Sequence, residues 1–553
     1  MDQGISDQAG VNRFSGPPLI FDNSYVRELP GTYVAWRPVR APQPRLLFLN
    51  RELAGELGLN ADTLAGEAGT DWFSGNTLPA GAEPIAQIYA GHQFGGFSPQ
   101  LGDGRALLIG ELIDRHGHRR DIAFKGSGPT PFSRGGDGRA AVGPMLREAL
   151  VSEAMHALGI PTTRALAVAA TGAPVRRETM LPGAILTRVA ASHLRVGTFQ
   201  FFAARRDVDT LRRLADYAIA RHDPDLIDAP DRYLQLLRAV GQRQAKLVAQ
   251  WMNVGFIHGV MNTDNMTLSG ETIDYGPCAF LEAYRPDTVF SSIDETGRYA
   301  YANQPLIARW NLARFADTLL LLVADPADEK AMAPAIARAT EVIDAFPLWY
   351  ADALLAGQRA KLGIRGDGAD DEADRRLIDD WLTLMHTDQV DFTLGWRRLA
   401  DAADGNDRAL RALFADSDAL NAWLVRWGER CSRDDANMSA PVGKSARQSA
   451  IRADTGGISE ATTAQDEICH NAGADSLQSA RAQAMRRVNP LVIARNYRVE
   501  EALAAASNDG DLELFKHLLA AVRRPYEDDP AQTYYAEPAP AEVAATYRTF
   551  CGT

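Results

Sequence analysis

The 553-residue chain has few cysteines, no long apolar run and no excess of basic residues. Four cysteines cannot form the disulfide framework of a small secreted domain, and no Cys-x-x-Cys pair indicates a zinc site. No run of about 18 apolar residues occurs, so no membrane span is expected. The first residues lack the basic and apolar segments of a secretory signal. We therefore expect a protein of the reducing cytoplasm with no membrane partner.

The charge balance argues against a further class of partner. Asp and Glu number 71 against 58 Lys and Arg, which gives a net charge of −13. A broad phosphate-neutralising surface needs a basic excess, so nucleic acid is not expected to bind. The hydrophobic share of 46% and the charged share of 23% are those of an ordinary globular protein. The length suits either several domains or one large bilobed catalytic unit.

The first part of the chain, residues 1–195, is predicted to be mixed α/β. Apolar runs at Ala106–Leu112 and Asp121–Phe124 indicate strands. Apolar residues at helical spacing then predict a helix over Val142–Leu158. Gly159 is expected to end this helix, because glycine tolerates the left-handed conformation that follows many helices.

The rest of the chain is predicted to fall into three segments. Residues 196–430 are mostly helical by the same criterion. Residues 431–480 form a polar insertion without Phe, Tyr or Trp, which buries too little apolar surface to fold tightly and is expected to be a loop with some helix. Residues 481–553 form a short helical unit, followed by a tail without clear periodicity.

The densest group of polar residues is the segment His258–Asn265, which is followed by Asp274. Two short β-like runs on either side of Ser269-Gly270 predict a hairpin, whose open end would bring Asn265 and Asp274 together. An amide oxygen beside a carboxylate suits Mg²⁺, which prefers oxygen ligands and leaves positions for phosphates. Protein kinases use the same pair of residue types.

One position departs from the kinase pattern. Kinase-like sequences of the small-molecule type have an aspartate two residues after the histidine and the metal-binding asparagine seven residues after it. Here Asn265 is in register with His258, but Val260 occupies the position of the aspartate. Asp264 stands next to Asn265 instead. A base displaced along the loop accepts a proton at a different place, which counts against ordinary γ-phosphoryl transfer.

Residues upstream are candidates for binding phosphates. Lys125 ends a β-like run and Glu148 lies on the helix that follows, which is the arrangement of the kinase ion pair. Two glycine clusters, Gly102–Arg105 and Gly135–Arg139, would let backbone N–H groups approach phosphate oxygens. Each of these features alone also fits an ordinary turn or a surface cation. The further candidate cations are Arg188 and Arg195.

Several short stretches form one specific pattern: Tyr89–Gly95, Gly102–Arg105, Lys125–Gly128, His258–Asn265, Asp274–Pro277, Asn489–Pro490 and Arg495–Asn496. This pattern resembles the selenoprotein O family (bacterial YdiU type), whose members are protein-kinase-like enzymes that transfer AMP rather than phosphate. The resemblance runs from about residue 18 to the C-terminus, apart from residues 432–480.

The resemblance implies an α+β, bilobed protein-kinase-like fold with a mixed α/β N-lobe, a mainly helical C-lobe and a C-terminal extension. ATP would sit inverted relative to an ordinary kinase, with its α-phosphate exposed. Asp264 would be the general base, and Asn265 with Asp274 would bind Mg²⁺ or Mn²⁺. Glu148 would pair with Lys125. The residues that would hold the nucleotide are Gly102, Gly104, Arg105, Lys125, Asp137, Gly138, Arg188, Arg195 and Asp274.

The predicted activity is protein adenylylation, in which a Ser, Thr or Tyr hydroxyl of a protein substrate attacks the α-phosphorus and pyrophosphate leaves. Two alternatives stay open at this point. One is a protein or small-molecule kinase, which Val260 disfavours. The other is a catalytically idle nucleotide-binding scaffold, which would not need all four of Lys125, Asp264, Asn265 and Asp274. Cys551 stands where the family has selenocysteine or cysteine, and it is a candidate for redox control.

Overall fold

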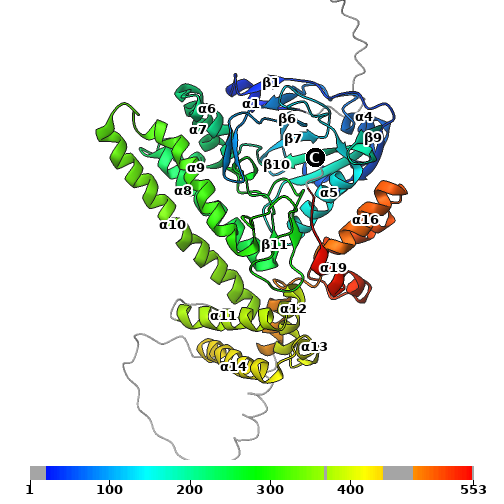
Figure 1. Ribbon diagram of the computed structural model, residues 1–553, viewed down its shortest axis with the longest axis vertical. Coiled ribbons are helices and arrows are strands. Elements are labelled where there is room, and N and C mark those ends of the chain that lie inside the picture. The colour runs from blue at the N-terminus through cyan, green and yellow to red at the C-terminus, as the bar shows by residue number, and fades with distance from the viewer. Residues whose placement is uncertain (1–19, 366–369, 440–476, 551–553) are drawn as a thin grey trace, which may run out of the picture.

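The computed structural model describes residues 20–365, 370–439 and 477–550. Within these ranges the chain is mixed α+β (Figure 1): strands dominate before residue 190, and helices dominate after it. The predicted order of a mixed α/β region followed by a mainly helical region is confirmed. No helix in the described ranges combines the length and the hydropathy that crossing a bilayer requires.

An antiparallel sheet forms the N-terminal region. Its strand order is β1-β3-β6-β7-β10-β9-β2, and β8 pairs with β10. The runs predicted at Ala106–Leu112 and Asp121–Phe124 lie in β6 and β7, where Ala106 is opposite Lys125. A separate short hairpin is formed by β4 and β5. The strands are β1 (Tyr33–Ala35), β2 (Arg45–Leu49), β3 (Ile85–Gln87), β4 (Gly91–Gln93), β5 (Gly96–Ser98), β6 (Ala106–Ile113), β7 (Arg119–Lys125), β8 (Ala140–Ala141), β9 (Arg164–Arg176) and β10 (Met180–Ala190).

The two faces of the sheet are covered by different helices. Side chains alternate along a strand, so Leu107 and Ile109 of β6 pack into one apolar cluster and Leu108 into another. The first cluster includes side chains of α2 to α4, and the second includes those of α5. As predicted, α5 stops before Gly159, which has a φ of +78°. These helices are α1 (Ser24–Glu28), α2 (Arg51–Glu56), α3 (Ala61–Leu64), α4 (Glu67–Phe73) and α5 (Val142–Ala157).

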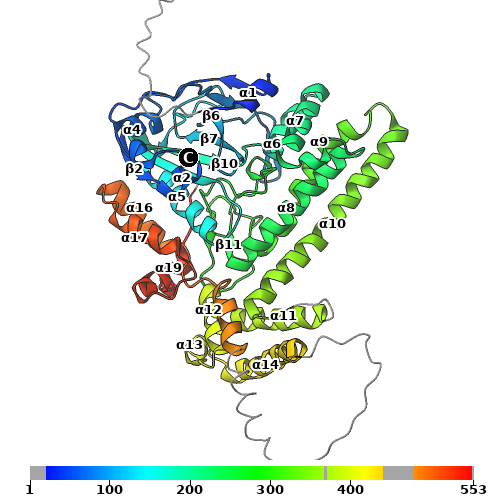
Figure 2. The same cartoon turned by 180° about the vertical axis from the view of Figure 1, so that it is seen from behind.

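The helical part is built on three long helices, α8, α9 and α10, which pack against one another (Figures 1 and 2). Beyond them, α11, α12 and α14 bury four tryptophans in a second core. The helices of this part are α6 (Val196–Ala204), α7 (Val208–His222), α8 (Arg232–Val254), α9 (Gln304–Val323), α10 (Glu329–Leu362), α11 (Asp371–Thr387), α12 (Phe392–Ala403), α13 (Arg408–Arg411) and α14 (Ser417–Ser439). The short elements between them are η1 (Pro224–Leu226), β11 (Phe256–Ile257), η2 (Thr263–Asn265), β12 (Ala279–Phe280) and η3 (Tyr301–Asn303).

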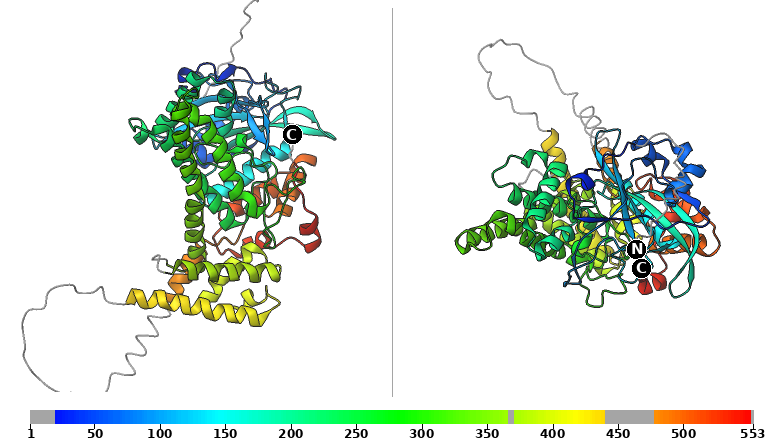
Figure 3. Two further views of the ribbon diagram at one scale, coloured as in Figure 1. Left: turned by 60° about the vertical axis from the view of Figure 1, so that its left-hand side comes forward. Right: turned by 90° about the horizontal axis from the view of Figure 1, so that it is seen from above.

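The C-terminal unit returns to the N-terminal region. Helices α16 and α17 pack against α5, although more than 300 residues separate them in the sequence (Figures 2 and 3). The predicted polar insertion is helical at both of its described ends, because α14 continues to Ser439 and residues 477–486 are helical. Residues 440–476 lie outside the described ranges. The last elements are α16 (Asn496–Asn508), α17 (Glu513–Val522), η4 (Pro530–Gln532), α18 (Thr533–Ala536) and α19 (Ala541–Thr546).

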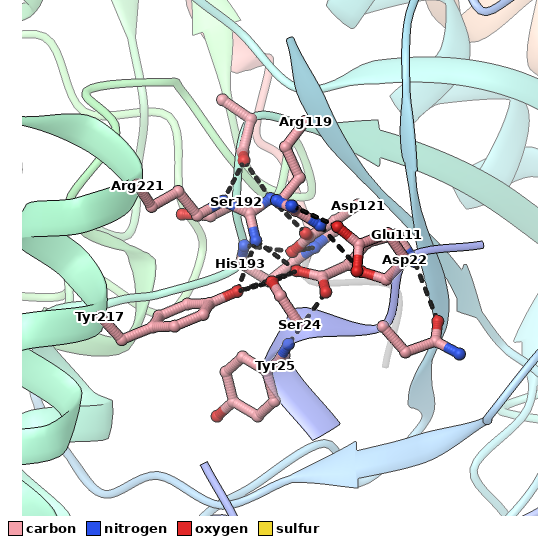
Figure 4. Close-up of polar contacts among 12 residues, drawn as sticks. Asp22, Ser24, Tyr25, Glu111, Arg119, Asp121, Ser192, His193, Tyr217 and Arg221 are labelled. Carbon is pink, nitrogen blue, oxygen red and sulfur yellow. Dashed lines mark hydrogen bonds and ion pairs between the residues drawn. The ribbon is translucent and has the colours of Figure 1, made fainter. Parts of the chain in front are cut away.

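A buried charged network joins the sheet to α7 (Figure 4). Arg221 of α7 forms ion pairs with Asp121 of β7 and Glu111 of β6, and it also donates to the carbonyl of Ala191. The backbone N–H of His193 donates to Asp121 at 2.8 Å. Because residues 191–195 link β10 to α6, the network fixes this connection against both the strands and the helix.

Candidate active site

One cavity of about 350 Å³ brings together the site residues predicted for nucleotide, base and metal. One wall is the part of the sheet that carries Ala106 of β6, Lys125 of β7 and Arg188 of β10. The opposite wall is the loop that contains η2. Its predicted residues are Gly102, Gly104, Arg105, Lys125, Asp137, Gly138, Arg188, Arg195, Asp264, Asn265 and Asp274. Sequence positions up to about 170 apart therefore meet in one place.

The glycines bring two loops into close contact on one wall of the cavity. Gly102 has a φ of +85°, and a Cβ atom there would lie 2.5 Å from the ring of Phe132. Gly138 has a φ of +61°, and its Cβ would lie 2.2 Å from the carbonyl oxygen of Gly128. Both positions therefore require glycine, for conformation and for space. Because glycines carry no side chain, the backbone N–H groups of this wall can approach phosphate oxygens.

Lys125 stands at the centre of a buried charged cluster. At the end of β7, its ammonium group forms ion pairs with Glu148 of α5 and with Asp274. Arg188 of β10 also binds Asp274, at 2.7 Å, and lies 3.9 Å from Glu148. The ion pair predicted between Lys125 and Glu148 is present. Glu148 thus fixes the lysine, and the lysine faces the cavity.

Asp274 is strongly biased towards its ionised form. Burial alone would raise the pKa of this carboxyl, but Lys125, Arg188 and Arg195 hold it well below its ordinary value. Its φ of +64° is uncommon for a residue with a side chain, so the local backbone is strained. Such strain at a cavity wall is typical of a residue held in place for a function.

The predicted metal ligands fit a hard divalent cation. Asn265 and Asp274 both line the cavity, and the side-chain nitrogen of Asn265 donates to the carbonyl of Val260 at 3.0 Å. This bond fixes the amide group, whose oxygen is the atom suited to a metal. No group of three or more His, Cys, Asp or Glu residues with metal-binding geometry occurs in the part of the chain that the structure describes. Two protein oxygens suit Mg²⁺ or Mn²⁺, which complete their coordination with phosphates and water.

Asp264 is a cavity carboxylate with one buried oxygen that lacks a hydrogen-bond partner among the described residues. Its side chain is buried, and its Oδ1 atom has no hydrogen-bond partner in the described structure. Oδ2 accepts a bond from the side-chain amide of Gln93 at 3.4 Å. Gly91 makes room for this carboxylate, because a Cβ there would lie 2.6 Å from Oδ1. Burial raises the pKa of Asp264 to about 6, against the opposing charge of Arg195.

Comparison with known proteins places the chain in a family. Residues 19–523 match the family described as "Protein adenylyltransferase SelO". The chain belongs to this SelO family. It is similar to proteins named "Protein nucleotidyltransferase YdiU" from Cereibacter sphaeroides (55% identity over 534 residues, 96% of this chain and 99% of the relative) and Chromobacterium violaceum (56% over 523 residues, 94% and 99%). A third relative of that name, from Mycobacterium sp. strain KMS, is 53% identical over 535 residues, 97% of this chain and 99% of the relative.

In this SelO family chain, the runs on either side of Ser269-Gly270 were predicted to pair as a hairpin. That prediction is wrong. Gly270 does form a turn, with a φ of +78°. However, Thr267 forms a bridge with Arg195, and Thr272 forms one with Thr162. The two runs therefore pair with segments far away in the sequence and not with each other. Asn265 and Asp274 nevertheless reach the same cavity.

Gln93, Tyr89 and Arg177 are among the cavity residues of the SelO family chain that were not assigned a role from the sequence. The side-chain amide of Gln93 donates to Oδ2 of Asp264. The guanidinium group of Arg195 lies over the ring of Tyr89, with 4.4 Å between its central carbon and the ring centre. Arg177 forms an ion pair with Asp137 at 3.0 Å. The motif Tyr89–Gly95 contributed to the family resemblance and pointed to this segment. Nothing in the local sequence indicated Arg177.

The cysteines contribute little to the cavity that the structure describes. Cys551 lies outside the described residues. Cys278 is buried, its thiol donates to the carbonyl of Tyr275 at 3.3 Å, and it is not part of the cavity lining. Burial raises the pKa of the Cys278 thiol to about 11, so it stays protonated and weakly nucleophilic at neutral pH.

Proposed function

We propose that this chain is a protein adenylyltransferase that moves AMP from ATP to Ser, Thr or Tyr hydroxyls of proteins and releases pyrophosphate. Membership of the SelO family supports the reaction class. The observation that carries the mechanism is the buried carboxylate of Asp264, which lines the cavity and whose Oδ1 atom has no partner in the described structure. A buried carboxylate at a cavity wall is suited to accept a proton from an incoming hydroxyl.

We also propose that the fold is of the protein-kinase type. In this reading the sheet and α5 form an N-lobe, residues 196–430 form a C-lobe, and residues 481–553 form a C-terminal extension beyond the insertion at 431–480. The ion pair between a strand lysine and a helix glutamate supports the assignment, because kinases use this pair to position phosphates. The cavity between the sheet edge and the η2 loop supports it further.

The acceptor side of the reaction centres on Asp264. A substrate hydroxyl gives its proton to the carboxylate of Asp264 while its oxygen forms a bond with the α-phosphorus. The bond from that phosphorus to the pyrophosphate oxygen breaks in line with the attack. A base with a pKa of about 6 is ionised at neutral pH and still accepts a proton in the transition state.

The nucleotide side uses the cations of the cavity. Lys125, Arg188 and Arg195 neutralise the phosphates and the negative charge that develops on the leaving pyrophosphate. Asn265 and Asp274 would hold Mg²⁺ or Mn²⁺, which supplies further charge neutralisation and orients the phosphates when bound. The other arginines that line the cavity are Arg105, Arg134, Arg139 and Arg177.

Two other readings have less support. For a kinase, the residue two after His258 would have to act as base, but Val260 is apolar and buried. In an idle scaffold, Asp264 would lower the stability of the folded protein without serving a reaction, because a buried carboxylate without a full set of partners is destabilising. Both facts favour a proton transfer at Asp264.

Parallel reactions with ATP labelled on the α- or the γ-phosphate test the proposal. The acceptors are the enzyme itself and casein, with Mg²⁺ or Mn²⁺ added. Transfer of label from the α- but not the γ-phosphate is expected, together with its loss in Asp264→Asn. Transfer from the γ-phosphate alone would establish a kinase. Nucleotide binding without any transfer would support the scaffold.

A further inference from the structure

The hairpin formed by β4 and β5 lies directly on the loop that carries Asp264. The backbone N–H of His92 donates to the hydroxyl of Thr263 at 2.7 Å, and that of Phe94 donates to the side chain of Asn262 at 3.1 Å. Between these two anchors, Gln93 lines the cavity and contacts Asp264. The hairpin therefore forms the part of the wall next to the proposed base.

The same hairpin exposes two aromatic side chains. Phe94 and Phe97 are 39% and 42% exposed. Phe94 adopts a φ of +50°, a conformation that is disfavoured for a residue with a side chain. Glycine or asparagine would fit this turn more easily. An aromatic residue kept exposed in a strained position beside a cavity points to a contact with another molecule.

Two arginines beside the hairpin have no anionic partner. Arg298 stacks on Trp310 with 4.9 Å between its guanidinium carbon and the ring centre, and it lies against the hairpin at Gly95. Arg205 donates to the carbonyl of Pro99, just beyond β5. Within the described ranges, no carboxylate lies at ion-pair distance from either guanidinium group. Arg314, which also stacks on Trp310, is paired with Asp317 at 3.1 Å.

We propose that residues 91–98, with Arg205, Arg298 and Trp310, form the docking surface for the substrate polypeptide and favour acidic residues on either side of its hydroxyl. This inference rests on the proposed function. A hydroxyl that reaches Asp264 is part of a chain that must pass over the neighbouring wall. Carboxylates of that chain would meet Arg298 and Arg205, and its apolar atoms would meet Phe94 and Phe97.

Peptides of one length with a single central hydroxyl residue test the docking surface. Three sets are compared, in which the flanking positions are all Glu, all Gln or all Lys, and each set is made with Ser, Thr and Tyr. With ATP labelled on the α-phosphate, the native enzyme should modify the Glu set about tenfold more efficiently than the Lys set. Arg298→Glu should remove or reverse that preference, and Arg298→Lys should retain most of it.

A matched control is available on α8. Arg238 stacks on Trp349 at 5.7 Å, is exposed, and has no carboxylate partner within the described ranges, but it does not line the cavity. Arg238→Glu should leave the ratio between the Glu and Lys sets unchanged. This control separates a general effect of charge on the enzyme from a local effect at the docking surface.

The outcomes separate the inference from the proposed function. Equal labelling of the three peptide sets by the native enzyme would overturn the docking surface, as would an unchanged ratio in Arg298→Glu. Labelling of the enzyme itself or of casein, but of no peptide, would also overturn it while leaving the proposed function intact. Absence of α-label on every acceptor would refute the proposed function, and the inference with it.

Discussion

Replacing Asp264 with asparagine is expected to stabilise the protein while it abolishes AMP transfer. The reason is that the buried carboxylate is ionised at neutral pH in surroundings that oppose its charge. Burial raises its pKa from 3.8 to about 6. Asparagine has the same shape without the charge, so Asp264→Asn removes the penalty and the proposed base together. A gain in stability from a loss of function is common at catalytic residues.

The size of the effect follows from proton linkage. A pKa raised by about two units in the folded state corresponds to about 3 kcal/mol of lost stability once the group is ionised in both states. Below about pH 4 both states are protonated and the penalty is absent. It grows as the pH rises and is complete above the folded pKa of about 6. At pH 5 it amounts to about 1.5 kcal/mol, because only the unfolded state is then mostly ionised.

Unfolding of the native protein and of Asp264→Asn at several pH values, without nucleotide or metal, measures this penalty. The melting temperature of the variant should exceed that of the native protein by more at pH 7.5 than at pH 5. Glu271→Gln is the matched control, since burial also raises the pKa of Glu271, to about 7, and Glu271 does not line the cavity. It should show a similar pH trend and keep its activity. A variant Asp264→Asn that melts below the native protein at pH 7.5, or that still transfers AMP, would refute the reasoning.

Three further results are expected. Lys125→Met should weaken ATP binding at least about tenfold in a titration and lower the melting temperature, because it leaves Glu148 and Asp274 without their shared cation; unchanged affinity would remove Lys125 from the nucleotide site. Asn265→Ala should raise the Mg²⁺ or Mn²⁺ concentration for half-maximal transfer about tenfold, with little change in stability, and an unshifted metal titration would argue against Asn265 as a ligand. Gln93→Glu should place a second carboxylate beside Asp264 and move the acidic limb of the pH–rate profile up by about one unit, whereas Gln93→Ala should move it less; a fixed profile would show that Gln93 does not act on Asp264.

The parts of the fold that the sequence predicts well are those with local causes. The helix expected at Val142–Leu158 is α5, and its end at Gly159 follows from a conformation that glycine adopts easily. The strands β6 and β7 follow from short apolar runs between turns. The gathering of these residues in one cavity was also predictable, because a family pattern links positions that periodicity alone cannot connect.

The parts that escaped prediction depend on contacts between distant residues. Thr267 and Thr272 were expected to pair across a turn, but backbone groups near Arg195 and Thr162 are their partners. Which of two partners a short β-like run selects is decided by tertiary packing, and local sequence does not encode it. Gln93 is uncharged, and its residue type alone indicates no catalytic role. Its importance comes only from the position of Asp264, 171 residues later.

The position of Asp274 has a consequence for the order in which small molecules bind. The cations that hold this carboxylate, Lys125 and Arg188, are the same ones proposed for the phosphates. A nucleotide that arrives alone would draw them away and leave a buried anion poorly compensated, whereas a divalent cation arriving with it would take their place. ATP and metal should therefore bind cooperatively, and by thermodynamic reciprocity each would raise the affinity for the other by the same factor. The cavity would then bind ATP and the divalent cation together, and it would bind ATP without the cation more weakly.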